Sequence, residues 1–149
     1  MGDLRPFLRR RPDGRCRLMG ILNVTPDSFH ADSRVDLESA VGRAMQMWSN
    51  GADWVDVGGE STRTGADPVD PQEEMMRVIP VIKAIREANP AGLISIDTRR
   101  FEVARAALEA GANMINDVSG LRDPEMADLV LEQGCAVCVM HMQLSLIHI

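Results

Sequence analysis

Long apolar runs are missing from this 149-residue chain. No stretch approaches the ~20 apolar residues that a membrane-spanning helix needs, so we expect no part of it to cross a bilayer. A secretory signal is missing too, because the six arginines among residues 1–17 are not followed by an apolar run. We therefore expect a cytoplasmic protein.

Cysteine is scarce as well, with three residues, which is an odd number and too few for a disulfide framework. Cys135 and Cys138 have the C-x-x-C spacing of redox sites, but that motif works at a helix N-terminus. Here the pair leads into a predicted strand, on which positions three apart point to opposite faces. No further Cys or His pair has zinc-finger spacing. We expect these two cysteines to pack in the core.

Positive charge is concentrated in the first residues. The formal net charge is −6, and residues 1–17 hold six arginines against two aspartates, so the rest of the chain is strongly acidic. Only this N-terminal arm could offer nucleic acid a basic face. Within the arm, Pro12-Asp13-Gly14 is a turn signal that predicts a solvated hairpin. We expect no binding to nucleic acid.

The nucleotide-binding motifs G-x-G-x-x-G and G-x-x-x-x-G-K-[ST] are absent, which argues against a Rossmann dinucleotide-binding fold and against a P-loop. What is present is a regular alternation of short apolar runs and helical patterns. This alternation predicts parallel strands joined by helical crossovers, an α/β fold. The predicted strands are 18–22, 54–57, 93–96, 113–115 and 136–140, and the predicted helices are 36–50, 71–88, 100–110 and 124–133.

Each of the five predicted strands ends in a hydrogen-bonding or ionisable residue. A ring of polar strand ends favours a (β/α)8 TIM barrel over an open doubly wound sheet, which concentrates its site at one switch point. An eightfold barrel needs about 250 residues. We therefore expect a barrel truncated after about its fifth strand. The polar residues are Asn23, Glu60 (after Gly58-Gly59), Asp97, Asn116-Asp117 and His141.

Two of the loops after these strands have the residues of a ligand site. Asn23 opens the first loop, where its amide oxygen could reach a ligand or a metal, although Asn often only shapes a turn. The second loop spans 58–65, where glycines admit close backbone approach, Thr62 adds a hydroxyl and Arg63 an anion-binding fork.

A carboxylate and an amide follow the next two strands. Asp97 and Asn116 could together bind the edge of a flat heterocycle, the carboxylate accepting from ring N–H groups and the amide both donating and accepting. The structural alternative is helix capping, which Asp97-Thr98 could provide. Polar residues at five successive strand ends favour a site over five separate caps.

Five sequence blocks follow one another in a fixed order: Met19-Gly20-Ile21-Leu22-Asn23-Val24-Thr25-Pro26-Asp27-Ser28-Phe29, Asp56-Val57-Gly58-Gly59-Glu60-Ser61-Thr62-Arg63, Ile94-Ser95-Ile96-Asp97-Thr98, Ile115-Asn116-Asp117 and Val139-Met140-His141-Met142-Gln143. Together they resemble the dihydropteroate synthase family, over about residues 18–143. The resemblance implies an eightfold barrel that uses Mg²⁺ and forms a homodimer. The implied reaction condenses 4-aminobenzoate with (7,8-dihydropterin-6-yl)methyl diphosphate, giving dihydropteroate and diphosphate.

The same resemblance implies roles for individual residues. Asn23 would hold Mg²⁺ and, with Thr62 and Arg63, the diphosphate. Asp97 and Asn116 would bind the pterin edge. The remaining implied contacts are Met140 against the pterin face, and Phe29, Ser28 and Arg63 around the aminobenzoate; Asp97, Asn116 and Arg63 form the implied catalytic set.

The sequence also departs from the family. Thr64 stands where a proline is usual and 30–33 read His-Ala-Asp-Ser, which bears on aminobenzoate affinity more than on pterin binding. The family's later Asp, Lys and Arg-x-His residues have no counterpart. We therefore expect residues 1–149 alone to be inactive. A pterin-binding methyltransferase domain and a non-catalytic fragment are the alternative interpretations.

The sequence divides into three parts. Residues 1–17 form the arm, 18–143 the N-terminal part of a pterin-binding barrel, and 144–149 a tail. The tail is apolar where a polar loop is expected at a barrel mouth. One codon choice for it resembles a sequencing-library adapter, so we expect it to be a non-native scar.

Overall fold

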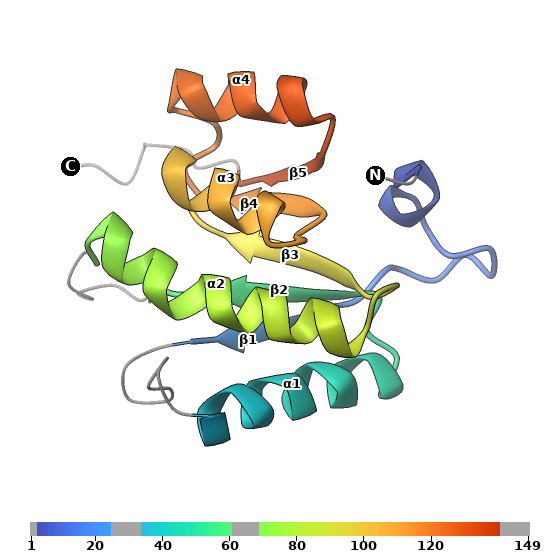
Figure 1. The fold of residues 1–149 in the computed structure, drawn as a ribbon. Coiled ribbons are helices and arrows are strands. Elements are labelled where there is room, and N and C mark those ends of the chain that lie inside the picture. Colours follow the sequence, from blue (N-terminus) through green and yellow to red (C-terminus); the bar gives the residue numbers. More distant parts are fainter. Residues whose placement is uncertain (1–2, 25–33, 61–68, 141–149) are drawn as a thin grey trace, which may run out of the picture.

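The computed structural model describes residues 3–24, 34–60 and 69–140, apart from the side chains of Arg34 and Val35. Within these ranges a 3-10 helix precedes five strands that alternate with four α-helices (Figure 1). The elements are η1 (Arg5–Leu8), β1 (Met19–Asn23), α1 (Arg34–Ser49), β2 (Trp54–Gly58), α2 (Pro71–Ala88), β3 (Leu93–Asp97), α3 (Phe101–Glu109), β4 (Met114–Asp117), α4 (Pro124–Gln133) and β5 (Ala136–Val139).

The five strands form one parallel sheet in the order β1-β2-β3-β4-β5. An open doubly wound sheet reverses its strand order at a switch point, whereas a barrel adds each new strand on the same side. The observed order confirms the predicted TIM-barrel type over the described part of the chain. No helix in the described residues is long and apolar enough to cross a membrane.

Local sequence signals explain where the helices begin and end. The Asp70 side chain accepts a hydrogen bond from the backbone N–H of Gln72 at 2.9 Å, and Pro71 occupies the first turn of α2. Asp123 caps α4 in the same way. Gly134 ends α4 with a φ of 58°, in the left-handed region that favours glycine. These caps fix the predicted bounds of both helices.

The two faces of the sheet differ. One face packs against the helices and forms the main core, to which Val55, Val57, Ile94, Ile96 and Ile115 contribute from the strands. The other face carries three rows of side chains across the strands, because residues in register lie side by side. From the N-terminal to the C-terminal end of the strands, these rows are Met19, Trp54 and Leu93; then Ile21, Asp56, Ser95, Met114 and Ala136; then Asn23, Gly58, Asp97, Asn116 and Cys138.

The N-terminal arm lies at the end of the sheet where the strands begin (Figure 1). Its predicted turn is present, since the Gly14 N–H donates to the Arg11 carbonyl at 2.8 Å. The expectation of a solvated hairpin holds in part. Most residues of the arm are exposed, but the flanks of the turn are not strands, and Arg11 and Arg17 pair with Asp53.

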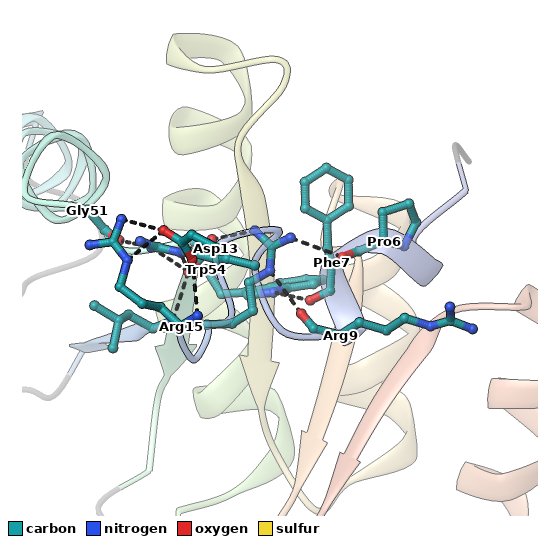
Figure 2. Close-up of polar contacts among 11 residues, drawn as sticks. Pro6, Phe7, Arg9, Asp13, Arg15, Gly51 and Trp54 are labelled. Atoms are coloured by element: carbon teal, nitrogen blue, oxygen red, sulfur yellow. Dashed lines mark hydrogen bonds and ion pairs between the residues drawn. The ribbon is translucent and has the colours of Figure 1, made fainter.

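Contacts with the sheet hold the arm in place (Figure 2). The Trp54 Nε1 donates to the Phe7 carbonyl at 3.4 Å, and the Arg17 guanidinium lies 5.4 Å from the Phe7 ring centroid. Arg17 also donates to the Arg9 carbonyl at 3.1 Å. Buried polar partners, which the charge pattern alone does not show, therefore determine the conformation of the arm.

The cysteines follow the prediction in part. Cys135 is half-buried and packs against the main core, whereas Cys138 is exposed, so core packing is wrong for Cys138. The reason is its place in the row of Asn116, on the face of the sheet that the helices leave uncovered. All three cysteines are free.

Candidate active site

The row nearest the C-terminal ends of the strands brings three predicted site residues to one level. Asn23 is in register with Gly58, Gly58 with Asp97, and Asp97 with Asn116. A Cβ placed on Gly58 would lie 3.5 Å from Asp97 Oδ2 and 3.8 Å from Asn23 Oδ1. Because position 58 has no side chain, the amide of Asn23 and the carboxyl of Asp97 face a common space above the Gly58 backbone.

The Asn116 side chain is hydrogen-bonded to the neighbouring row of the sheet, which contains Ile21, Asp56 and Ser95. Its Nδ2 donates to Asp56 Oδ2 at 2.9 Å, across the inner face from β4 to β2. The backbone carbonyl of Asn116 accepts from the Thr98 N–H at 3.1 Å, which joins the ends of β3 and β4. The first bond restrains the side-chain amide, and the second fixes the backbone that carries it.

Among the described residues, the carboxyl groups at this end of the sheet outnumber the cations that pair with them. Burial, and then the negative charges of Asp56, Glu74, Glu60 and Asp117, raise the pKa of Asp97 to about 7. Among the described residues no arginine or lysine forms an ion pair with Asp97. Such a carboxyl can exchange a proton near neutral pH, which is typical of functional sites.

Asp117 has a structural role. Its Oδ1 accepts from the Ser119 N–H at 2.7 Å and its Oδ2 from the Leu121 N–H at 2.9 Å. These bonds close the turn after β4, where Leu121 has a φ of 57°. Both carboxylate oxygens of Asp117 are thus occupied by the turn, in contrast to Asp97.

Arg100, Glu60 and Glu74 form a cluster of ion pairs near the C-terminal ends of the strands, and the sequence did not predict these pairs. Arg100 pairs with Glu60 and with Glu74, whose side chain is 1% exposed, and also donates to the Val69 carbonyl. Glu74 lies in the first turn of α2. Its spacing of four from Val78 and eight from Ile82 places it on the buried stripe of the helix, and this signal could have revealed it.

Asp56 is a second residue with a role that the sequence does not predict. It lies in the buried strand β2, and nothing in the local sequence distinguishes it from the apolar residues around it. Burial raises its pKa, which the nearby Ser95 hydroxyl and Asn116 amide only partly offset.

The other predicted site residues divide into two groups. Met140 follows β5, donates its backbone N–H to the Asp117 carbonyl at 3.3 Å and is 45% exposed. Its contact with a pterin stays a prediction. The residues predicted for diphosphate and aminobenzoate, Ser28, Phe29, Thr62 and Arg63, lie outside the described residues, as do His141 and the 144–149 tail.

Metal binding rests on Asn23 alone in the described part of the chain. The described ranges contain no group of three or more His, Cys, Asp or Glu side chains that could hold a metal ion. The Asn23 side chain is exposed, and an amide oxygen is a suitable ligand for Mg²⁺, which usually takes one or two protein ligands with water and phosphate. The residue fits the predicted role without establishing it.

Known proteins resemble this chain over most of its length. Residues 19–146 match the family described as pterin binding enzyme. A dihydropteroate synthase from Streptococcus pyogenes serotype M1 is 50% identical over 133 residues, which are 88% of this chain and 50% of that protein. The chain therefore spans about half the length of this relative.

Two solved structures give the same result. The dihydropteroate synthase of Xanthomonas albilineans with 4-aminobenzoic acid has a TM-score of 0.76 and 47% identity, covering 86% of this chain and 48% of that one. The enzyme of Clostridium difficile in the presence of pteroic acid has a TM-score of 0.79 and 48% identity, covering 85% and 49%. Each agrees with the sheet order and with a barrel of greater length.

Proposed function

Because the chain belongs to the pterin-binding enzyme family, we propose that it forms the pterin-binding part of a dihydropteroate synthase. The reaction joins 4-aminobenzoate to (7,8-dihydropterin-6-yl)methyl diphosphate and releases diphosphate. The observation that carries the proposal is the row of Asn23, Gly58, Asp97 and Asn116, where polar side chains converge at the C-terminal strand ends. Relatives solved with 4-aminobenzoic acid and pteroic acid support it.

The pterin edge would lie against Asp97 and Asn116. A pterin offers ring N–H and amino donors, and these two side chains supply a carboxylate and an amide to match them. Cleavage of the carbon–oxygen bond to the diphosphate leaves positive charge on the pterin methylene, which the amine of 4-aminobenzoate then captures. The Asp97 carboxylate stabilises that charge, and the charge in turn favours the ionised form of Asp97.

The diphosphate would lie beside Asn23. Asn23 would hold Mg²⁺, with Thr62 and Arg63 binding the diphosphate oxygens. When bound, the ion neutralises the leaving group. Ser28, Phe29 and Arg63 would enclose the aminobenzoate, and Met140 would cover the pterin. Assembly as a homodimer and a cytoplasmic location stay predictions.

A fusion protein tests the activity, since this chain spans about half of its relatives. Residues 1–143 are joined to the C-terminal half of the Streptococcus pyogenes enzyme, and this protein is called the fusion below. We expect it to form dihydropteroate from both substrates, and the 149-residue chain alone to form none. Asp97→Ala in the fusion is the inactive control.

Two outcomes would contradict the proposal. One is a fusion that unfolds cooperatively, and so is folded, yet binds no pterin diphosphate. The other is a fusion that binds the pterin but transfers a methyl group to or from it instead of forming dihydropteroate, which would favour the methyltransferase alternative.

A further inference from the structure

A buried carboxyl with an incomplete set of partners lies one row below the proposed pterin site. Asp56 is 3% exposed and stands in the middle of β2, between Ile21 and Ser95 in the register. Its Oδ2 accepts one hydrogen bond, from Asn116 Nδ2 at 2.9 Å. Its Oδ1 is buried without a hydrogen-bond partner in the part of the chain that the structure describes.

A structural role accounts for the other buried acids but not for this one. Asp53 is held by two arginines and Glu74 by Arg100. Asp117 closes a turn with two backbone N–H groups. Asp56 has neither a cation nor a backbone donor among the described residues, so it costs stability where it stands. Such a cost is common at functional sites.

The chemistry of the Asp56–Asn116 bond has a direct consequence. Asn116 turns its NH₂ group toward Asp56, because its Nδ2 donates to the Asp56 Oδ2 acceptor. An isolated amide could flip by 180° and exchange donor for acceptor at little cost. With Nδ2 held by Asp56, the Asn116 Oδ1 becomes the acceptor that remains for a ligand. Among the described residues no donor reaches this oxygen.

We propose that Asp56 is a positioning residue that fixes the orientation of the Asn116 amide, and thereby makes the site select ligand edges rich in N–H donors. This inference rests on the proposed function, because it concerns the pterin edge. Asp97 and Asn116, neighbours in register, then present oxygen acceptors side by side. The selected edge is the 2-amino-4-oxo edge of a pterin, and the rejected one is the 2,4-dioxo edge of a lumazine.

Two probes separate these edges, 6-hydroxymethylpterin and 6-hydroxymethyllumazine. Replacing the 2-amino group by oxygen turns a donor into an acceptor at that position and makes the neighbouring N1 a donor. A fixed amide must therefore discriminate against the lumazine, whereas an amide that is free to flip can bind both. The measured quantity is the ratio of the two dissociation constants, obtained by titration calorimetry on the fusion and on the 149-residue chain.

The variants are Asp56→Asn, Asp56→Ala and, as the matched control, Asp53→Asn. Asp53 precedes the same strand and pairs with Arg11 and Arg17 at the opposite end of the sheet, so the same substitution there removes an acid that does not contact Asn116. We expect the unaltered protein to prefer the pterin by roughly tenfold or more, the cost of leaving one buried polar group unpaired. Both Asp56 variants should reduce this preference about tenfold, mainly by weakening the pterin, and Asp53→Asn should preserve it.

The outcomes distinguish the two proposals. If the unaltered fusion forms dihydropteroate but Asp56→Asn weakens both probes by the same factor, Asp56 is only structural and the inference is overturned. If the unaltered protein binds neither probe, the proposed function fails and the inference fails with it. A preference changed equally by Asp53→Asn would also overturn it.

A readout without variants covers the case in which the Asp56 proteins do not fold. The Asn116 side-chain amide gives two proton signals in an ¹⁵N-correlated NMR spectrum. We expect one of them to be deshielded and slow to exchange with solvent, as a proton donated to a buried carboxylate should be. Two proton signals at the shifts of an exposed asparagine amide, both exchanging rapidly with solvent, would overturn the proposal.

Discussion

The pKa values of aspartates at the two ends of the sheet shift in opposite directions. At the end where the strands begin, Asp53 accepts from Arg11 Nη2 and Arg17 Nη1, each at 2.7 Å, and from the Leu18 N–H at 2.8 Å. Burial alone would raise the pKa of Asp53, but these donors outweigh it and hold the pKa well below its usual range. At the end where the strands finish, the pKa of Asp97 is raised to about 7.

The difference teaches which acids serve stability and which serve a ligand. An acid whose pKa falls on folding adds to the free energy of unfolding at neutral pH, and one whose pKa rises subtracts from it. The chain supplies cations to Asp53 and leaves Asp97 and Asp56 without them among the described residues. Asp56 and Asp97 lie in adjacent rows on the face of the sheet that the helices do not cover. A ligand with N–H donors and positive charge could supply the partners that these two carboxyl groups lack among the described residues.

The largest expected effect concerns the cation that is present at the C-terminal end. Arg100→Leu leaves Glu74 buried without a partner, and breaking such a pair costs about 3–5 kcal/mol. Urea unfolding of the fusion measures the loss. Arg99→Ala is the matched control, because Arg99 also pairs with Glu60 but is 48% exposed. Equal midpoints for the two variants would show that burial of the Arg100 pair is unimportant.

Loss of the Asp53 ion pairs, at the end where the strands begin, should have the next largest effect on the free energy of unfolding. Asp53→Ala removes hydrogen bonds between charged groups and is expected to cost about 1.5–3 kcal/mol. Since the Asp53 pKa is lowered on folding, this contribution is complete above its unfolded pKa of 3.8 and is lost as the pH falls below it. Asp13→Ala, which breaks an exposed pair with Arg15, should leave the urea midpoint nearly unchanged. A deficit of Asp53→Ala that persists undiminished at pH 2 would contradict the pairing.

Ligand binding gives a smaller but more specific effect. Asp97→Ala removes a hydrogen-bond acceptor for the pterin, worth about 1–3 kcal/mol, so the dissociation constant of the pterin diphosphate should rise roughly tenfold or more. Equilibrium binding to the fusion measures it. Asp123→Ala, which removes the cap of α4, should weaken the helix and leave this constant unchanged. An unaltered constant in Asp97→Ala would remove Asp97 from the site.

The same position also predicts a gain in stability that depends on pH. With a raised pKa, folded Asp97 binds more protons than the unfolded chain between about pH 4 and 7, so its contribution to stability falls as the pH rises through that window. Asn cannot ionise, and Asp97→Asn should therefore unfold at higher urea than the unaltered fusion at pH 8. The difference should vanish below pH 4. A loss of stability at pH 8 would mean that an unseen cation already pairs with Asp97.

Much of this arrangement could be predicted from the sequence where local rules decide. The helical pattern of residues 71–88 predicted the bounds of α2. Alternation of strand and helix predicted the parallel sheet, and polar strand ends predicted the row that contains Asn23, Asp97 and Asn116. Each of these signals acts within a few residues of the chain.

The remainder depends on contacts between distant segments. Arg11 meets Asp53 across 42 positions, and Arg100 meets Glu60 across 40, so neither charge pattern reveals its partner. The prediction of a solvated arm therefore missed the pairs of Arg11 and Arg17 with Asp53, and the pair of Arg100 with Glu74 was not predicted. The role of Asp56 could not be predicted either, because it depends on a hydrogen bond from Asn116, which lies 60 positions away in the sequence.

Titration of Asp53 and Asp97 in one sample tests the contrast between the two ends most directly. Carboxyl ¹³C signals of the fusion are followed with pH, with and without 6-hydroxymethylpterin, and assigned by Asp53→Asn and Asp97→Asn. We predict that Asp97 titrates near pH 7 and that only this titration moves when the pterin is added, while Asp53 stays ionised down to below pH 3.8. Two aspartates that both titrate near pH 3.8, neither responding to the pterin, would contradict the account.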